Sequence, residues 1–491
     1  MDSLLCDELV QEIFQRLPPS MSYTVPLVCK RWLFLHRTSK SSLSVRLPTH
    51  PYSISSFSSL LSRYPRLSSL TVIIDNSSTP LFSSDSSAET EAVHGPSLFW
   101  DHRLLSVASN CSYLRRLRFL AGPVSPSSLV SLSSSCKHLV SLSISSFRPF
   151  SFRWLTSFPS LKELFVVESH TANSIHFPTL EFDSDDDDDG THTSLPASEL
   201  PLESLCLTGI GAGDRRMGWL WRRCTKLRRL QLRSCEGTVD GASFSSFVRC
   251  LQGLQELELR TCRTIADGVL LRLAEHGSSL NSLLIYDGGS RDGLRQFIRR
   301  CSSTLQKLDL RLPLDLDNDH LSAVAENFLG LVSLRLQSCC LVTGEGLKTL
   351  GTAMSAGLEE LALINCDVVE REPGLLVTLG QSLRVLRKLD LSHNEMLLDK
   401  EFVSMLVSCK NLVDIKLRGC KNLTDVALVS IFKNCKLLES LDILHCCWIG
   451  AKEVEFFVLN HPRLRRLEVE ESKLSGGAKM WASQKFIEFV G

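Results

Sequence analysis

The chain has 491 residues, and its 54 lysines and arginines are balanced by 54 aspartates and glutamates. This zero net charge argues against a generally basic nucleic-acid binder, and no apolar stretch reaches the roughly 18–20 residues that a membrane-spanning helix needs. Eighteen cysteines without a recognisable secretory signal indicate reduced thiols and a location in the nucleus and/or cytoplasm.

The N-terminal segment predicts a short amphipathic helix. Apolar residues recur at every fourth position, at Leu5, Leu9, Ile13 and Leu17, and Pro18 then ends the helix. A second helix is expected after Pro26, in the stretch Val28-Cys29-Lys-Arg-Trp32. Some 45 residues can bury only a small core, so exposed apolar side chains here would form a docking face for another protein. Alternatively, Ile13, Phe14 and Trp32 are simply the core of this small domain.

A repeated phrase, Leu-x-x-Leu-x-Leu, dominates the remainder of the chain. Eleven copies follow one another at intervals of 25 to 28 residues, and they begin at Leu202, Leu227, Leu254, Leu280, Leu305, Leu331, Leu358, Leu386, Leu412, Leu438 and Leu464. Weaker copies begin at Leu67, Leu114, Leu139 and Leu161, which gives about fifteen repeats. The alternating leucines predict a short strand with one buried face.

The residues between two phrases predict a helix. In the stretch from Asp425 to Phe432, Thr424 or Asp425 can cap the N-terminus, and an apolar face is expected from Val426, Leu428, Val429 and Phe432. A strand and a helix in about 26 residues, stacked on copies of themselves, form an α/β leucine-rich-repeat solenoid. We expect parallel strands on its concave face and helices on its convex face.

Most cysteines follow the repeat period. Six end strands, at Cys235, Cys262, Cys339, Cys366, Cys420 and Cys446, and seven precede the next phrase, at Cys111, Cys136, Cys224, Cys250, Cys301, Cys409 and Cys435. Such positions indicate small buried side chains in tight turns. No metal site, cofactor or catalytic residue is predicted, because no zinc-ligand spacing, phosphate-binding loop or nucleophile motif is present.

Two loop insertions and a C-terminal cap complete the predicted organisation. The insertions lie near residues 75–95 and 181–199, and the second contains the acidic run from Asp183 to Asp189. Both are too polar to bury a core of their own. Residues 471–491 carry many apolar residues after Gly476-Gly477, which predicts a short helix that covers the exposed end of the last repeat. A flexible tail and a partner-binding peptide are the alternatives.

The strand positions between the leucines suggest where a partner would bind. On the expected concave face they bring together Arg233, Arg260, Tyr286, Arg311 and Arg335. Arginine presents a planar fork of donors suited to carboxylate or phosphate groups, so this patch could recognise an acidic or phosphorylated protein segment, or a small anionic ligand. Alternatively, Glu256, Glu258 and Asp309 neutralise the arginines through pairs across the strands. The sequence leaves both alternatives open.

The N-terminal segment resembles the F-box, from Leu5-Cys6-Asp-Glu-Leu9 to Val28-Cys29-Lys-Arg-Trp32, over about residues 3–46. Together with the repeats, the chain resembles the F-box/LRR family with cysteine-containing repeats, of the kind found in plants. The resemblance gives an all-α F-box over residues 1–46, whereas the repeats give a solenoid over 47–470 and the apolar C-terminal segment gives a cap over 471–491. One departure is Cys6, which stands where the family usually has proline.

The resemblance implies a non-catalytic substrate receptor of an SCF (cullin–RING) ubiquitin ligase. By this resemblance, the F-box binds a Skp-family adaptor, which links it to the cullin and RING subunits, and the solenoid binds an unidentified protein substrate. The adaptor-binding positions carried over from the family motif are Leu5, Cys6, Leu9, Ile13, Leu17, Pro18, Val28, Cys29 and Trp32. A non-degradative scaffold and a receptor completed by a small anionic ligand are the alternatives. Neither a nucleic acid nor a membrane is an expected partner.

Overall fold

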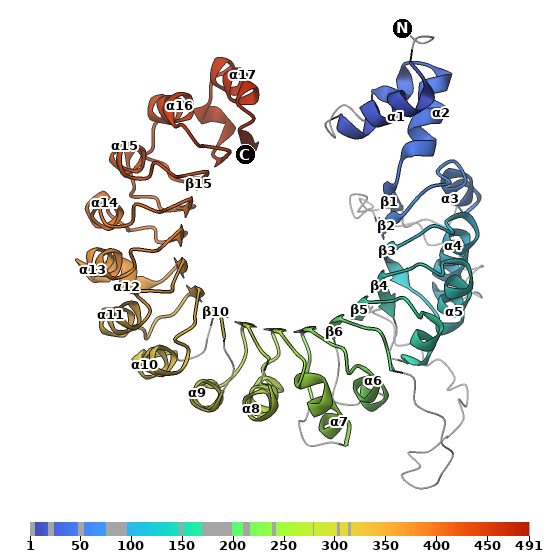
Figure 1. Cartoon of the computed structure of the whole chain (residues 1–491), viewed down its shortest axis with the longest axis horizontal. Coiled ribbons are helices and arrows are strands. Elements are labelled where there is room, and N and C mark those ends of the chain that lie inside the picture. Colours follow the sequence, from blue (N-terminus) through green and yellow to red (C-terminus); the bar gives the residue numbers. More distant parts are fainter. Residues whose placement is uncertain are drawn as a thin grey trace, which may run out of the picture. The chain divides into compact units, whose positions relative to one another are not determined.

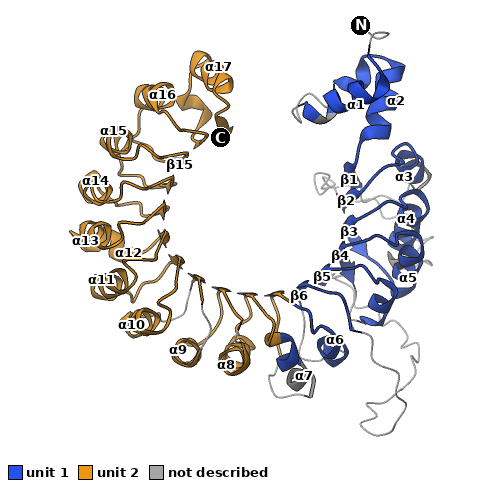
Figure 2. Cartoon of the chain, viewed as in Figure 1, with its two compact units in different colours: residues 1–227, 245–250 blue, residues 228–244, 251–491 orange. Residues whose placement is uncertain are grey.

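The computed structural model describes residues 5–17, 24–47, 54–74, 96–146, 151–168, 199–209, 217–237, 242–277, 279–301, 305–312 and 316–490. The chain divides into two compact units (Figure 2): unit 1 comprises residues 1–227 and 245–250, and unit 2 comprises residues 228–244 and 251–491. Residues 75–95 and nearly all of the predicted insertion at 181–199, including its acidic run, lie outside the described residues.

Unit 1 begins with helices and continues with strands that form a sheet and with helices in the connections between them (Figure 1). Its elements are α1 (Asp7–Arg16), η2 (Val25–Leu27), α2 (Lys30–Ser39), β1 (Ser42–Leu47), α3 (Ile54–Leu61), β2 (Ser69–Ile74), α4 (Pro96–Asn110), β3 (Arg116–Pro123), α5 (Pro126–Ser135), β4 (Ser141–Ser146), η3 (Arg153–Ser157), β5 (Glu163–Glu168), β6 (Ser204–Thr208) and α6 (Met217–Arg223). Consecutive strands from β1 to β6 pair in parallel.

Unit 2 repeats a shorter strand and a helix. Its elements are β7 (Arg229–Arg233), β8 (Glu256–Arg260), α8 (Ala266–His276), β9 (Ser282–Tyr286), α9 (Arg291–Arg300), β10 (Lys307–Arg311), α10 (Asn318–Asn327), β11 (Ser333–Gln337), α11 (Gly344–Ala353), β12 (Glu360–Ile364), α12 (Asp367–Arg371), α13 (Leu375–Ser382), β13 (Lys388–Asp390), α14 (Asp399–Leu406), β14 (Asp414–Lys416), α15 (Asp425–Asn434), β15 (Ser440–Asp442), α16 (Ala451–Asn460), β16 (Arg466–Glu468), η4 (Glu471–Lys473), α17 (Gly476–Gln484) and β17 (Glu488–Val490). Helix α7 (Ala242–Leu251) has residues in both units.

The strand register confirms the repeat reading of the sequence. Strands β2 to β16 each begin two residues after the first leucine of one of the fifteen predicted phrases. All strand pairs of unit 2 are parallel, and equivalent leucines such as Leu308 and Leu334 lie side by side in the core. The helices cover one face of each sheet (Figure 1), and we call the other face, which carries the alternate strand residues, the open face. The fold is therefore an α/β leucine-rich-repeat solenoid, as predicted.

The turn after each strand explains the cysteines. In unit 2 the residue that follows a strand often has a left-handed backbone, for example Asn365 with φ 49° and Ser338 with φ 57°. The next residue points inward, and at Cys366 its Sγ donates to the carbonyl of Leu336 in the preceding repeat, at 3.6 Å. Asn394 takes the same position one repeat later and donates to Leu363 O at 2.8 Å. These side chains tie neighbouring turns together.

The burial of the cysteines confirms their predicted role in packing. All thirteen cysteines at the two repeat phases are buried, whereas Cys6, Cys340 and Cys447 are exposed. Burial raises the pKa of the Cys250 and Cys446 thiols to about 12. These thiols are therefore neutral small apolar groups at physiological pH.

The apolar face predicted for residues 425–432 was wrong for its two valines, although Leu428 is buried as predicted. In α15 the buried residues are Ala427, Leu428 and Ile431, whereas Val426 and Val429 are exposed. Both valines fit an amphipathic pattern on the helix alone. The helix turns Ala427 and Ile431 inward because its orientation is fixed by packing on neighbouring repeats, which the pattern of one helix does not specify.

Both ends of the array differ in detail from the predicted regions. Ser42–Leu47, which includes five residues of the range predicted for the F-box, is strand β1 and pairs with β2. At the other end, α17 is followed by β17, which pairs with β16. Ala482 and Ile487 of this end are buried, but Phe486 is 89% exposed, so only part of the apolar load covers the last repeat.

In the portion of the chain that the structure describes, no helix is both long and apolar enough to cross a bilayer.

Candidate protein-interaction surfaces

Helices α1 and α2 of unit 1 pack against each other through a small aromatic contact. The rings of Phe14 and Trp32 meet edge to face, with their centroids 5.3 Å apart. Each helix also buries an aliphatic residue, Val10 in α1 and Leu35 in α2. Arg31 donates to the carboxylate of Asp7 at 2.7 Å and to the carbonyl of Leu5 at 2.7 Å. These contacts hold the start of α1 against α2.

Several apolar residues of this segment remain outside that small core. Leu9 is 49% exposed and Ile13 is 46% exposed, although both belong to the helix that buries Val10. They are four residues apart, so they lie on one face of α1. Burying the half that is still exposed against a partner would stabilise a complex by about 1 kcal/mol for each side chain.

The structure separates the two interpretations that the sequence left open. Phe14 and Trp32 serve the internal packing, whereas Ile13 does not. Of the nine motif positions, Leu5, Cys6, Leu9, Ile13 and Val28 are exposed, and Leu17, Cys29 and Trp32 are half-buried. Pro18 lies outside the described residues.

Two of the motif cysteines occupy helix starts. Cys29 is the N-cap of α2, and its sulfur accepts a hydrogen bond from the backbone N–H of Trp32 at 3.4 Å. Cys6 occupies the N-cap of α1, where its side chain makes no capping hydrogen bond. Pro26 is the second residue of the short turn η2 and does not begin α2, which starts only after Cys29.

The predicted arginine patch lies on the open face of unit 2, and its members fall into two rows. Arg233, Arg260, Tyr286 and Arg311 are register partners on successive strands from β7 to β10. Arg335 belongs to the neighbouring row, where it pairs in register with Asp309. The row of Arg311 continues instead with Gln337. The sequence had placed all five residues together because residues two apart on a strand share a face.

Carboxylates hold each arginine of this patch. Glu258 lies between Arg233, at 3.2 Å, and Arg260, which donates its Nε–H to the same carboxylate. Arg311 donates two hydrogen bonds to Asp309, at 2.9 and 2.7 Å, and this pairing raises the pKa of Arg311. The patch is therefore neutralised by Glu258 and Asp309, as in the second of the two alternatives that the sequence left open. Glu256, the third acidic residue of that alternative, pairs instead with Arg229 outside the patch.

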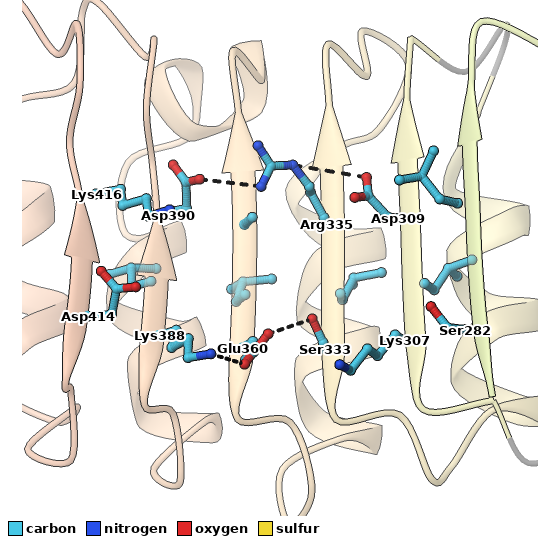
Figure 3. Close-up of a pocket in the computed structure, with 16 residues that line it drawn as sticks. Ser282, Lys307, Asp309, Ser333, Arg335, Glu360, Lys388, Asp390, Asp414 and Lys416 are labelled. Carbon is cyan, nitrogen blue, oxygen red and sulfur yellow. Dashed lines mark hydrogen bonds and ion pairs between the residues drawn. The ribbon is translucent and has the colours of Figure 1, made fainter. Parts of the chain in front are cut away.

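A hollow of about 350 Å³ lies on the open face of unit 2 between β9 and β14 (Figure 3). Arg335 lies at its centre and spans Ala362, the small residue of the next strand, to come within 3.6 Å of Asp390. On its other side, its Nε is 4.0 Å from Asp309. The absence of a long side chain at Ala362 is what lets Arg335 reach across β12.

A second row crosses the same hollow. Glu360 accepts hydrogen bonds from Ser333 Oγ at 3.0 Å and Lys388 Nζ at 2.5 Å (Figure 3). Burial raises the pKa of Glu360, but the hydrogen bonds from Lys388 and Ser333 lower it, and the net direction is downward. Within the described part of the chain, Lys307 and Lys416 are the two basic residues of the hollow that have no ion pair.

The hollow is lined by four basic and four acidic side chains: Lys307, Arg335, Lys388, Lys416, Asp309, Glu360, Asp390 and Asp414. A balanced set of this kind suits a polar protein segment that carries both charges better than a single small anion. The sequence patch contained only Arg335 of these residues. Asp309, Asp390 and Lys416 occupy the strand position of Arg335 in other repeats, whereas the patch left out the first strand position, which holds Lys307, Glu360, Lys388 and Asp414. Among the described residues, no cluster of histidine, cysteine and acidic side chains is arranged to bind a metal ion.

Comparison of the sequence with known proteins finds a distant relative of the F-box/LRR-repeat type. No protein-family model matches the chain. It is 26% identical, over 156 residues, to F-box/LRR-repeat protein 4 of Bos taurus, a match that covers 31% of this chain. The match covers 24% of that relative, so the chain spans about a quarter of its length.

Solved structures that match this chain are distant from it in sequence. A yeast Rad7–Elc1 complex is 12% identical, with a TM-score of 0.41 over 99% of this chain and 92% of the other. A TLR13–ssRNA13 complex is 13% identical, with a TM-score of 0.45 over 87% of this chain and 65% of the other. A leucine-rich-repeat protein of Leptospira interrogans is 14% identical, with a TM-score of 0.38 over 94% and 92%. Scores of this size carry no argument about function.

Proposed function

We propose that this chain, which is of the F-box/LRR-repeat type, is a substrate-recognition subunit of an SCF (cullin–RING) ubiquitin ligase. The observation that carries the proposal is the exposure of Leu9 and Ile13 on a helix whose other apolar residues, Val10 and Phe14, pack inward. In this proposal, α1 and α2 bind a Skp-family adaptor, which connects the chain to the cullin and RING subunits.

The open face of the solenoid holds the protein substrate in this proposal. Ubiquitin transfer takes place on other subunits, and this chain contributes by raising the concentration of substrate lysines near the charged conjugating enzyme. The neutralised arginine row of unit 2 gives no support to a small anion as a required part of the site, because Glu258 and Asp309 already occupy the guanidinium donors.

Adaptor binding tests the first half of the proposal. Replacing both Leu9 and Ile13 with alanine should weaken binding to a purified Skp-family adaptor by at least about tenfold, since both side chains would lose their burial in the complex. Because both residues are exposed in the free chain, the double variant should melt at the temperature of the wild type.

A matched control removes exposed apolar residues elsewhere. Leu329 and Val407 of unit 2 are exposed to a similar or greater extent, so alanine at both positions should leave adaptor binding unchanged. Full adaptor binding by the folded Leu9→Ala/Ile13→Ala variant would refute the adaptor role.

Substrate binding tests the second half. Proteins that accumulate on the wild-type chain when the proteasome is blocked should also be captured by the Leu9→Ala/Ile13→Ala variant, but their half-lives should shorten only with the wild type. This variant is preferable to deletion of residues 1–46, because that deletion would remove most of β1 from the sheet. Captured proteins whose half-lives do not respond to the wild-type chain would instead support a non-degradative scaffold.

A further inference from the structure

Two arginines project side by side onto the open face of unit 1. Arg116 and Arg118 belong to β3, where the alternate residues Leu117 and Phe119 are buried in the core. Both arginines are exposed. Residues two apart on a strand are separated by about 7 Å, so both guanidinium groups can reach one small ligand.

Hydroxyl groups surround these arginines on the neighbouring strands. The register places one residue of β2 and one of β4 beside each arginine, at roughly 4.8 Å between strands. These four neighbours are Ser69, Ser141, Thr71 and Ser143. Each of them carries a hydroxyl that can donate a hydrogen bond.

No acidic residue of the adjacent strands balances this charge. Within the described residues, neither Arg116 nor Arg118 has an ion pair or a side-chain hydrogen bond. The nearest carboxylate in register is Glu163, which lies on β5, two strands and therefore about 10 Å from Arg116. Arg46 on β1 is likewise exposed and unpaired among these residues.

The open face of unit 2 has the opposite character. Each of its strand arginines lies within ion-pair distance of a carboxylate: Arg229, Arg233, Arg260, Arg311, Arg335 and Arg466. The same holds for Arg418, two residues after β14. Unpaired arginines are therefore not a general property of this repeat. On β3, among the described strands, two unpaired arginines stand side by side and leave their donors available for an anion.

We propose that the open face of β2–β4 binds the phosphate of a phosphorylated serine or threonine in the protein substrate. The inference rests on the proposed function, in which the open face holds the substrate. A phosphate monoester carries about two negative charges and three strong acceptor oxygens, which match two guanidinium groups and the flanking hydroxyls. A carboxylate has only two oxygens and one charge, so it would leave donors unused.

Other anionic partners fit this face less well. Nucleic acids are held by many phosphate contacts, and proteins that bind them tightly use some six to ten. Here the cluster consists of Arg116 and Arg118, with Arg46 two strands away. The charge is enough for one phosphate group and not for a polyanion.

The neighbouring residue on β5 indicates what accompanies the phosphate. Phe165 lies in the same row as Arg118, one strand beyond Ser143, and is half-buried. It is therefore about 10 Å from Arg118, which is about three residues of an extended peptide. We expect an apolar residue three positions from the phosphorylated one, in contact with the ring of Phe165.

The experiment presents the full chain with a degenerate peptide library that has a fixed central phosphoserine, beside a matched library with serine and another with glutamate. We expect the immobilised chain to retain the phosphoserine library at least about tenfold more than either other library. Sequencing of the retained peptides should show apolar residues enriched three positions from the phosphoserine.

Two variants separate the site from a general charge effect. Arg116→Ala/Arg118→Ala should lose the preference for phosphoserine while it keeps the melting temperature of the wild type, because neither arginine has a partner to lose. Arg229→Ala/Arg466→Ala removes the same charge from the open face of unit 2, and it should retain the phosphoserine library within about twofold of the wild type.

Three results would overturn the proposal: equal retention of the phosphoserine and serine libraries, equal retention of phosphoserine and glutamate, or full retention by Arg116→Ala/Arg118→Ala. None of these results bears on the adaptor. If adaptor binding responds to Leu9→Ala/Ile13→Ala and substrates are still captured, the proposed function stands and only the phosphate site fails. If the adaptor does not bind the wild-type chain, the ubiquitin-ligase role fails, whatever the libraries show.

Discussion

The open faces of the two units are built from the same strand phrase but differ in how they handle charge. In unit 2, arginines pair with carboxylates of the same strand or of the next one, as in the group of Arg233, Glu258 and Arg260. In unit 1, Arg116 and Arg118 have serine and threonine as their register neighbours. The leucines determine the fold in both units, whereas the residues between them decide whether a face is neutral or open to an anion.

The difference shows why a count of arginines does not locate a binding site. Unit 2 has the longer row of arginines, and the sequence therefore suggested a recognition patch there. An arginine that already donates two hydrogen bonds to Asp309, as Arg311 does, has fewer donors left for a partner. The arginines of β3 retain their donors because no carboxylate lies beside them.

Thiol labelling should show that the interiors of both units are alike. Cys136 in unit 1 donates to Cys111 O at 3.2 Å, and Cys446 in unit 2 donates to Leu417 O at 3.0 Å. Burial raises the pKa of Cys136 to about 11 and that of Cys446 to about 12. We expect the thirteen repeat-phase cysteines to react with iodoacetamide at least about 1000-fold more slowly than exposed thiols.

The measurement is mass spectrometry after brief labelling of the native chain. Cys6, Cys340 and Cys447 should be modified first because they are exposed. Rapid labelling of the repeat-phase cysteines in one unit only would contradict the view that both units share one kind of interior.

Removal of a paired arginine should destabilise unit 2 strongly. Arg418 lies 2.9 Å from Asp442, whose side chain is almost fully buried, and 2.5 Å from Glu468. Arg418→Ala should lower the free energy of unfolding by about 2–3 kcal/mol in urea denaturation, because it removes the cation that pairs with the buried Asp442 carboxylate and leaves it only the hydrogen bond from Leu444 N–H.

Arg118→Ala in unit 1 is the matched control, and its effect should stay within about 0.5 kcal/mol. Adding Asp442→Asn to Arg418→Ala should recover part of the loss, since burial already raises the pKa of Asp442 and disfavours its charged form. Equal destabilisation by Arg418→Ala and Arg118→Ala would remove the distinction between the two faces.

Glu258→Gln should convert part of the unit 2 face into the unit 1 type. The change removes the negative charge shared by Arg233 and Arg260, and we expect a loss of about 1–2 kcal/mol in the free energy of unfolding. The two freed guanidinium groups should give the variant an increased retention of the phosphoserine library, measured with the Arg116→Ala/Arg118→Ala background to silence β3. Unchanged retention would mean that free arginine donors are not enough to bind phosphate.

The smallest expected effect is on the pH dependence of stability. A hydrogen bond from Arg229 lowers the pKa of Glu256 below its usual value of 4.5. This pair therefore stabilises the fold above pH 4.5, and its contribution is lost as the pH falls below that value. Both side chains are about half exposed, so the contribution should be below about 0.5 kcal/mol.

Urea denaturation between pH 3 and pH 7 measures this contribution. Glu256→Gln should make the loss of stability in acid slightly shallower than in the wild type. Arg116→Gln in unit 1, which breaks no ion pair, should follow the wild-type curve. A steeper acid loss in Glu256→Gln would contradict the sign of the pKa shift.

Much of the architecture could be predicted from the sequence because the repeat is redundant. Fifteen phrases each specified a strand, and every one of them corresponds to a strand from β2 to β16. The two strands at the ends, β1 and β17, lack the full phrase and were not predicted. An end strand packs against only one neighbouring repeat, so fewer of its residues must be the buried leucines that define the phrase.

The candidate surfaces were predictable only in part. For α1, the four-residue spacing placed Leu9 and Ile13 on one face, but it did not distinguish them from Phe14, which packs on Trp32. On the open face, strand period assigned Arg233 and Arg260 to one side without showing that Glu258 lies between them. The strand period predicts which face of the sheet a side chain points to. Its ion-pair partner depends on which side chains lie beside it on that face, on the same strand and on the neighbouring ones.

The sequence alone determined the class of fold, the strand positions and the burial of the cysteines, because each is a local property repeated many times along the chain. The tertiary structure decided which charges meet. Arg335 reaches Asp390 across β12 because Ala362 leaves room for it, and Arg118 has no such partner because Thr71 and Ser143 are its neighbours. These contacts join residues 25 or more positions apart in sequence, and only the register of stacked repeats brings them within a few ångströms.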